Sequence, residues 1–148
     1  MQQNGQATSL AEAMRDGCLG VRIGRLHRVV ARRFEQALRP LGLSLPQLEV
    51  LGVLMLRGRL RPAAIAEALA LERSTVSRNL ALMGRNGWVA LESSPSGRAF
   101  SVAITPDGIE ILADARAAWM RAQTEVVGSL GPDSAATIDS WLGALAGE

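Results

Sequence analysis

The residues best suited to chemistry in this 148-residue chain are hydroxyls and arginines spaced along one predicted helix, residues 73–87. Apolar or small residues recur there at steps of three and four and predict a narrow buried stripe: Val76, Leu80, Met83 and Gly87. The opposite face holds small, hydroxylated and basic side chains and no acid: Ser74, Ser77, Arg78, Ala81 and Arg85. An ordinary solvated face mixes acids with bases, whereas a helix that enters a DNA major groove needs slim side chains and hydrogen-bond donors. The segment therefore indicates a DNA recognition helix.

A second helix is predicted just before this one. Residues 62–70 would form a short helix that opens with Pro62, because the fixed φ of proline suits the first helical position. Ile65 and Leu69 lie four residues apart and would face the same core as the stripe of the following helix. Residues 71–72 would form the tight turn between the two helices, as in a helix-turn-helix.

Two β-prone runs follow, at residues 88–92 and 99–104. They bracket residues 93–97, whose serines, proline and glycine are typical of a turn. The order helix, turn, helix, hairpin predicts a winged helix-turn-helix. Arg98 would lie at the hairpin tip with little to pack on, which favours contact with the minor groove or the DNA backbone.

Seven side chains are therefore candidates for DNA binding: Arg73, Ser74, Thr75, Ser77, Arg78, Arg85 and Arg98. Each also has an ordinary structural explanation, as a solvated surface arginine or as a hydroxyl that caps the start of a helix. The surrounding pattern favours the DNA-binding role for Arg78 and Arg98, and both explanations stay open for Arg73 and Arg85.

Further helices are predicted at residues 10–39, 46–56, 106–130 and 134–145; all are amphipathic except 46–56, which is apolar on most sides and is expected to be buried. Residues 1–9 are polar and are expected to form a frayed tail. Ser44 and Gln47 have the spacing of a capping box at the start of the second of these helices. Thr105 has the same role before the third, followed by a proline at the first helical position.

The outer helices carry more apolar surface than a small winged lobe can cover. Helix 106–130 is expected to bury one stripe: Ile109, Leu112, Ala115, Trp119, Ala122 and Val126. The last helix has its own apolar residues: Ile138, Trp141, Leu142 and Leu145. A two-fold dimer built from the first and the last two helices is the economical way to cover these surfaces.

Charge is divided unevenly along the chain. The formal net charge of +2 is the sum of +7 over residues 1–98 and −5 over residues 99–148. This division suits a protein with one end that binds a polyanion. The chain has no apolar run of the length that a membrane span needs and no signal-peptide pattern, so we expect a cytoplasmic protein without a membrane partner.

Few residues in the chain are suited to catalysis or to metal binding. His27 is the only histidine, Cys18 is the only cysteine, and tyrosine is absent. No acid–base pair, no set of soft metal ligands and no phosphate-binding glycine loop is recognisable. We therefore expect neither an enzyme nor a bound metal or cofactor.

Together these segments resemble the multiple-antibiotic-resistance regulator (MarR) family, over about residues 19–145. The resemblance lies in residues 65–80, residues 87–89, Arg98 and residues 104–108. Family members usually carry an Asp two residues before the wing arginine, which orients it, and this chain has Ser96 there. The resemblance implies a DNA-binding dimer, usually a repressor, whose small and often aromatic anionic ligand lies between the first two helices and the winged lobe.

A peroxide-sensing branch of the family uses a reactive cysteine early in the first helix and holds it with tyrosines. Cys18 lies a couple of residues from that position and the chain has no tyrosine. We therefore expect Cys18 to be a small, buried or half-buried thiol.

These observations predict a mainly α fold with a small β-hairpin wing, formed by the whole chain as one domain. Residues 45–105 would be the winged helix-turn-helix lobe, and residues 10–40 and 106–147 the helical dimerisation region. The expected function is that of a ligand-responsive regulator that binds a pseudo-palindromic site in double-stranded DNA as a homodimer. The alternative is a winged-helix module that docks or dimerises proteins without touching DNA.

Overall fold

The computed structural model describes residues 2–93 and 100–147 and divides the chain into two compact units, Met1–Arg33 and Phe34–Glu148. The elements follow in this order: α1 (Gln2–Gly17), α2 (Leu19–Leu38), the 3-10 turn η1 (Arg39–Leu41), α3 (Leu45–Arg57), α4 (Pro62–Ala68), α5 (Arg73–Arg85), β1 (Val89–Ser93), β2 (Phe100–Ile104), α6 (Pro106–Leu130) and α7 (Ser134–Ala146). Helices and a two-stranded hairpin thus make up the described chain, and the predicted mainly α fold with a winged helix-turn-helix is confirmed.

The structure of the first unit contradicts both predictions made for it, the frayed tail and the single long helix. The expected frayed tail is wrong, because a helix already begins at Gln2 and tolerates Gly5 among good helix formers. The single long helix is also wrong, because the chain breaks at Cys18, after Gly17. The guanidinium of Arg22 donates a hydrogen bond of 2.6 Å to the carbonyl of Asp16, one of the groups that the end of α1 leaves open. Cys18 itself is half-buried.

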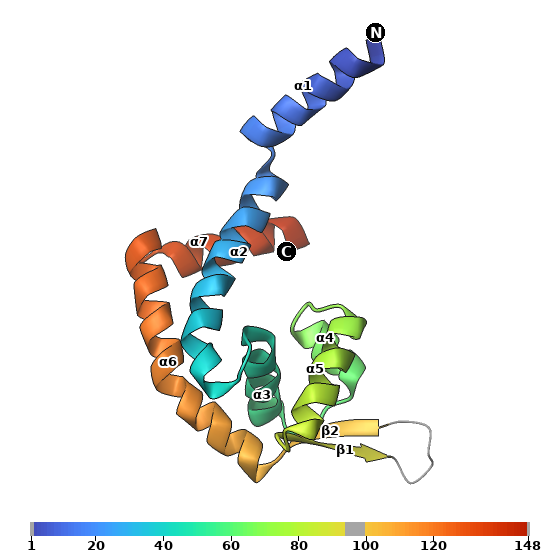
Figure 1. Ribbon diagram of the computed structural model, residues 1–148, viewed down its shortest axis with the longest axis vertical. Helices are drawn as coiled ribbons and strands as arrows, with labels where there is room; N and C mark the ends of the chain where they lie inside the picture. The colour runs from blue at the N-terminus through green and yellow to red at the C-terminus, as the bar shows by residue number, and fades with distance from the viewer. Residues whose placement is uncertain (1, 94–99, 148) are drawn as a thin grey trace. The chain divides into compact units, whose positions relative to one another are not determined.

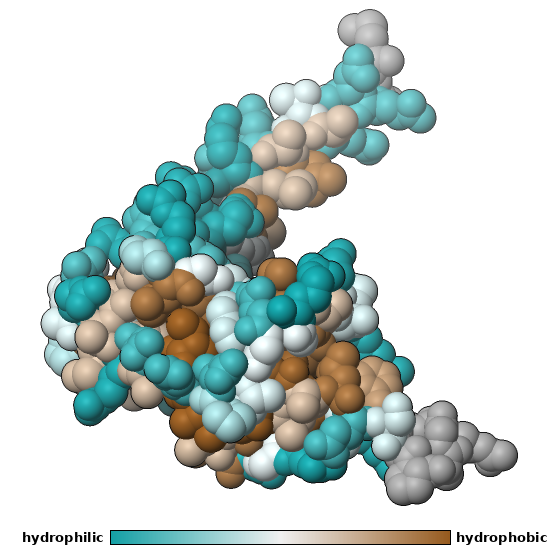
Figure 2. All heavy atoms as spheres, turned by 60° about the horizontal axis from the view of Figure 1, so that its bottom comes forward, coloured by the Kyte–Doolittle hydropathy of each residue, from teal (hydrophilic) through white to brown (hydrophobic). Residues whose placement is uncertain are grey.

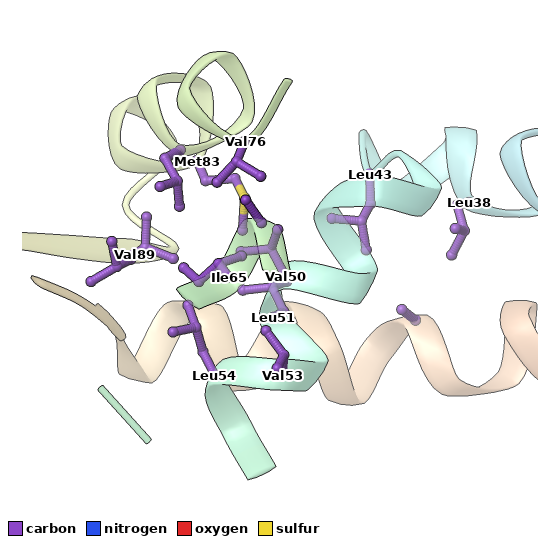
Figure 3. Close-up of a cluster of buried hydrophobic side chains, with 14 of the residues drawn as sticks. Leu38, Leu43, Val50, Leu51, Val53, Leu54, Ile65, Val76, Met83 and Val89 are labelled. Carbon is purple, nitrogen blue, oxygen red and sulfur yellow. The ribbon is translucent and has the colours of Figure 1, made fainter. Parts of the chain in front are cut away.

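In the second unit α3 lies between the helix pair α4–α5 on one side and α6 on the other (Figure 1). Four apolar side chains of α3 are buried: Val50, Leu51, Val53 and Leu54. They pack in one cluster with residues of α4, α5 and the hairpin, among them Ile65, Val76, Met83, Val89 and Val102 (Figure 3). This shared core fixes α5 by its inner stripe, as its spacing predicts.

The start of α3 shows the predicted capping box. Ser44 Oγ accepts from the backbone N–H of Gln47 at 3.4 Å, and Gln47 Oε1 accepts from the N–H of Ser44 at 3.0 Å. Glu35, near the end of α2, adds a third bond by accepting from the N–H of Leu45 at 3.0 Å. Three of the open donors at this helix start are therefore satisfied by side chains.

Helix α6 buries a stripe of small residues: Ala115, Ala118, Ala122 and Val126. The prediction that Trp119 and Ile109 are part of this stripe is wrong, because their side chains are 40% and 44% exposed. Alanines occupy the buried positions, which lets α6 approach α3 closely, and Trp119 lies at the edge of that contact.

Helix α7 follows Gly131 and has no buried residue in the described chain. Its apolar side chains stay open to solvent: Ile138, Trp141, Leu142 and Leu145 are 39%, 53%, 60% and 82% exposed. Figure 2 shows apolar patches between hydrophilic side chains on the face of the molecule that it presents. Within the described residues, no helix combines the length and the apolar character that crossing a membrane requires.

Candidate nucleic-acid interface

The outward face of α5 is presented as the sequence predicts. Its inner residues Val76 and Met83 are fully buried and Leu80 is 3% exposed. The opposite side is solvent-exposed and carries no acid: Arg73, Ser74, Ser77, Arg78, Ala81 and Arg85. Thr75 is half-buried beside this face. A basic, hydroxylated and slender surface is thus held on a helix that the core keeps rigid.

The hydroxyls of this face do not cap the helix. Helix α5 begins at Arg73, and the capping position before it, Glu72, makes no side-chain cap bond. Ser74, Thr75 and Ser77 therefore lie inside the helix. Thr75 Oγ1 accepts a long hydrogen bond of 3.4 Å from the guanidinium of Arg78, which holds this arginine along the first turns of the helix.

A hollow of about 600 Å³ separates the start of α5 from α4. It brings Arg73 and Ser74 together with two exposed carboxylates, Glu67 and Glu72. Glu67 lies six residues before Arg73 in the sequence and Glu72 one residue before it, so the acid-free pattern of α5 itself gave no signal of them. Their negative charges oppose the charge of Arg73 and so lower the positive potential at the start of α5.

The hairpin pairs β1 with β2 from Val89 opposite Ile104 to Ser93 opposite Phe100. Leu60, in the connection between α3 and α4, forms an isolated β-bridge to β2: it exchanges backbone hydrogen bonds of 3.0 and 2.8 Å with Val102. The strands begin and end within one residue of the prediction. Arg98, the predicted wing contact, lies outside the described residues.

Next to this bridge, Arg59 forms an ion pair with Glu92 of β1. Both terminal nitrogens of the guanidinium, Nη1 and Nη2, take part, and the bond from Nη2 to Oε1 measures 3.1 Å. The two residues are 33 positions apart in the chain, so their charges alone gave no signal of the pairing.

The base of the hairpin is fixed to both neighbouring helices. Helix α5 ends in a Schellman motif: Gly87 has a φ of +76°, and the N–H of Trp88 donates to the carbonyl of Met83 at 2.9 Å. Gly87 thus belongs to this turn and is not part of the helical stripe, contrary to the prediction. Thr105 Oγ1 donates to the Gly87 carbonyl at 2.6 Å and accepts from the N–H of Gly108 at 3.0 Å, as the predicted cap of α6.

Gly108 lets α6 approach the hairpin closely. A Cβ added there would lie 2.1 Å from the carbonyl oxygen of Trp88 and 2.8 Å from Ile104 Cγ1. Since real Cβ atoms do not come so near a backbone oxygen, only glycine fits this position. Helix α5, the hairpin and α6 therefore meet in one rigid junction.

A second concave feature lies between α3 and α6. It is an open groove of about 450 Å³ with a mainly apolar lining: Leu45, Leu48, Gly52, Leu112, Ala113 and Ala115. Glu49, Arg116 and Trp119 complete it. No cluster of three or more His, Cys, Asp or Glu side chains suited to a metal ion occurs among residues 2–93 and 100–147.

Comparisons with known proteins agree with this geometry. A family model described as "MarR family" matches residues 41–99. No curated protein matches the chain. Among solved structures, the M. tuberculosis transcriptional regulator MosR in complex with DNA is 30% identical, with 87% of this chain and 96% of that chain covered and a TM-score of 0.75.

Two further structures support the fold. A mutant of E. coli MarR complexed with operator DNA is 21% identical, covers 90% of this chain and 96% of its own, and has a TM-score of 0.78. BpsR of Bordetella bronchiseptica, whose DNA binding is regulated by 6-hydroxynicotinic acid, is 21% identical, covers 88% and 94%, and has a TM-score of 0.77. With the winged lobe matched by the family model and nearly the whole chain by MosR, the chain belongs to the MarR family.

Proposed function

We propose that this protein is a transcription regulator that binds a specific, pseudo-palindromic site in double-stranded DNA as a homodimer. The observation that carries this proposal is the acid-free outward face of α5, with Arg73, Arg78 and Arg85 exposed on a helix whose inner stripe is buried. The relative MosR has been solved with DNA bound, and such a face suits insertion into a major groove. A regulator of chromosomal DNA works in the compartment that holds the DNA, so we expect it in the cytoplasm.

Individual roles follow from the position of each side chain. Ser74, Ser77 and Arg78 would contact base edges or phosphates from the first turns of α5, with Thr75 orienting Arg78. Arg73 and Arg85, at the two ends of the helix, would contact the phosphate backbone on either side of the groove. For Arg98, in the sequence between β1 and β2, we keep the predicted contact with phosphates or the minor groove.

The test is titration of Arg78→Ala and Arg98→Ala against an operator and a scrambled duplex at several salt concentrations. The operator is first identified by mapping the sites that the protein occupies on its source genome. Arg78→Ala should weaken operator binding by about 1–3 kcal/mol per half-site and reduce the preference over the scrambled duplex. Arg98→Ala should weaken binding to both duplexes alike and flatten the salt dependence.

A matched control is Arg121→Ala, which removes the same charge from an exposed position on α6. Its effect should be smaller than that of either variant above. Operator binding by both variants at the parent's affinity would contradict the proposal. The alternative of a protein-docking module would then be preferred.

The dimer is proposed from the apolar side chains that a single chain leaves open. Helix α7 buries none of its residues, and Trp141, Leu142 and Leu145 are each more than half exposed. Patches of this kind on a globular protein usually mark an association surface. A second copy, related by a two-fold axis, would cover them and set the spacing of the two α5 helices.

Regulation by a small aromatic or anionic ligand is proposed from the groove between α3 and α6. Repression as the default output is proposed from the resemblance to the family alone. The apolar walls of the groove could take an aromatic ring beside Trp119, and the guanidinium of Arg116 could take a carboxylate. BpsR responds to 6-hydroxynicotinic acid, an aromatic carboxylate, which makes that acid a suitable probe. Binding would change DNA affinity only if the ligand prefers the conformation that is unsuited to DNA.

Calorimetric titration with 6-hydroxynicotinic acid tests this point. Gly52→Leu should abolish binding, because Gly52 lines the groove with nothing within 4 Å of an added Cβ, so a larger side chain would occupy the space. Gly128→Leu, at an open position on α6 outside the groove lining, is the control and should leave binding unchanged. Equal binding by the parent and Gly52→Leu would contradict the assignment of the groove.

A further inference from the structure

The pair Arg59–Glu92 crosses the outer face of the hairpin. The register of Leu60 against Val102 places Arg59 opposite Ala103, and Ser101 is paired with Glu92. The guanidinium therefore runs diagonally over β2, from the connection between α3 and α4 to the far strand β1. Small side chains at Ala103 and Ser101 leave room for this path.

The pair lies in the half of the hairpin that is least buried, where it can influence the direction of the strands. The buried end of the hairpin is held by Val89 and Val102, which are 4% and 0% exposed. Beyond it, Leu91 and Phe100 face the core side but are 50% and 48% exposed, so packing fixes the strands less firmly there. Glu92 lies in this poorly packed half, which makes the ion pair with Arg59 its main described attachment to the rest of the lobe.

The pair is too exposed to be a stability element. The side chains of Arg59 and Glu92 are 55% and 45% exposed, and exposed ion pairs contribute little to folding. A two-pronged arginine–carboxylate contact, however, fixes direction as well as distance. Such a contact can hold a protruding hairpin at one angle without adding much to the free energy of unfolding.

We propose that Arg59 and Glu92 form a strap that sets the angle of the hairpin relative to α5, and thereby the fit of the protein to DNA. This inference rests on the proposed DNA-binding function. It assigns a positioning role to two residues with opposite charges, so Arg59 acts through Glu92 and not by contacting phosphate. That distinction makes the inference testable.

The experiment compares Arg59→Gln, Glu92→Gln, the double variant, and the charge exchange of Arg59→Glu with Glu92→Arg. The first measurement needs no DNA: it is amide hydrogen exchange at Leu60 and Val102, whose N–H groups each donate to the other residue's carbonyl. The second is the dissociation constant for the operator and its salt dependence. Arg57→Gln is the matched control, since it removes one exposed arginine two residues before Arg59.

Both single variants should speed exchange at the two amides and weaken operator binding by about two- to fivefold, the coupling typical of an exposed pair. The double variant should be no weaker than either single one, and the charge exchange should recover most of the affinity. Arg57→Gln should leave the exchange rates as in the parent.

A direct contact between Arg59 and phosphate would give a different set of results. If Arg59 bound phosphate directly, Glu92→Gln would strengthen binding and only Arg59→Gln would weaken it, which would overturn the strap. Unchanged exchange and affinity in Glu92→Gln would overturn it as well. A parent protein that binds no duplex would instead overturn the proposed function, and with it the role of the strap on DNA.

Discussion

Replacing Gly108 with alanine tests whether α6 and the hairpin really share a rigid junction. The new Cβ would lie 2.1 Å from the carbonyl oxygen of Trp88, whereas ordinary contacts begin near 3.4 Å. The backbone must therefore move by more than 1 Å at a place where Thr105 makes hydrogen bonds of 2.6 and 3.0 Å. Overpacking costs about 1–3 kcal/mol in general, and an obstacle made of backbone places this variant near about 3 kcal/mol.

The matched control is Gly128→Ala in the same helix. An added Cβ there meets nothing within 4 Å, so the change should stabilise α6 by up to about 1 kcal/mol through helix propensity. The two variants have the same chemistry and should differ by about 3–4 kcal/mol in the free energy of unfolding. Urea denaturation at one fixed protein concentration measures this difference, because dimer stability depends on concentration.

A difference of less than about 1 kcal/mol between Gly108→Ala and Gly128→Ala would refute the reasoning. It would mean that the hairpin and α6 can move apart at little cost in free energy. The DNA affinity of Gly108→Ala is a second measurement of the same junction. If the junction sets the position of the hairpin, operator binding should fall even under conditions where the variant is fully folded.

Three further outcomes are expected. Thr105→Val removes the cap of α6 and leaves the Gly87 carbonyl without its donor, which should cost about 1–2 kcal/mol in urea unfolding, and Thr105→Ser should recover most of it. A chain that ends at Ser129 lacks α7 and should sediment as a monomer, whereas a stable dimer would show that other surfaces suffice. Cys18→Ser should leave DNA affinity and its response to mild peroxide unchanged, because the thiol is alone and half-buried, and loss of a peroxide response would contradict this view.

Features that depend on neighbours in the chain could be predicted from the sequence. The Ser44–Gln47 capping box and the Thr105 cap are formed by residues three apart, so their spacing is enough to identify them. The stripe of α5 was predictable for the same reason, since a helical period fixes which side chains share a face. The exposed basic face of the candidate site follows directly from that stripe.

Features that depend on the position of another element could not be predicted. A helical period places Trp119 and Ala118 next to each other, and only the closeness of α3 decides that the alanine is buried. The Arg59–Glu92 pair depends on strand register across 33 positions, which no local pattern encodes. The break at Cys18 had a partial signal in the glycines around it, but the exact place where α1 ends depends on which carbonyl finds a new donor.

The length of α6 has a mechanical consequence. Its 25 residues form a rod of about 37 Å with one end fixed to the base of the hairpin and the other leading into α7. A tilt of about 5° in such a rod moves its far end by about 3 Å, close to the rise of one base pair along B-DNA. In a dimer that holds the two copies through α7, a displacement of about 1.5 Å beside Trp119, near the middle of α6, would therefore shift the two α5 helices out of step with the turn of the double helix.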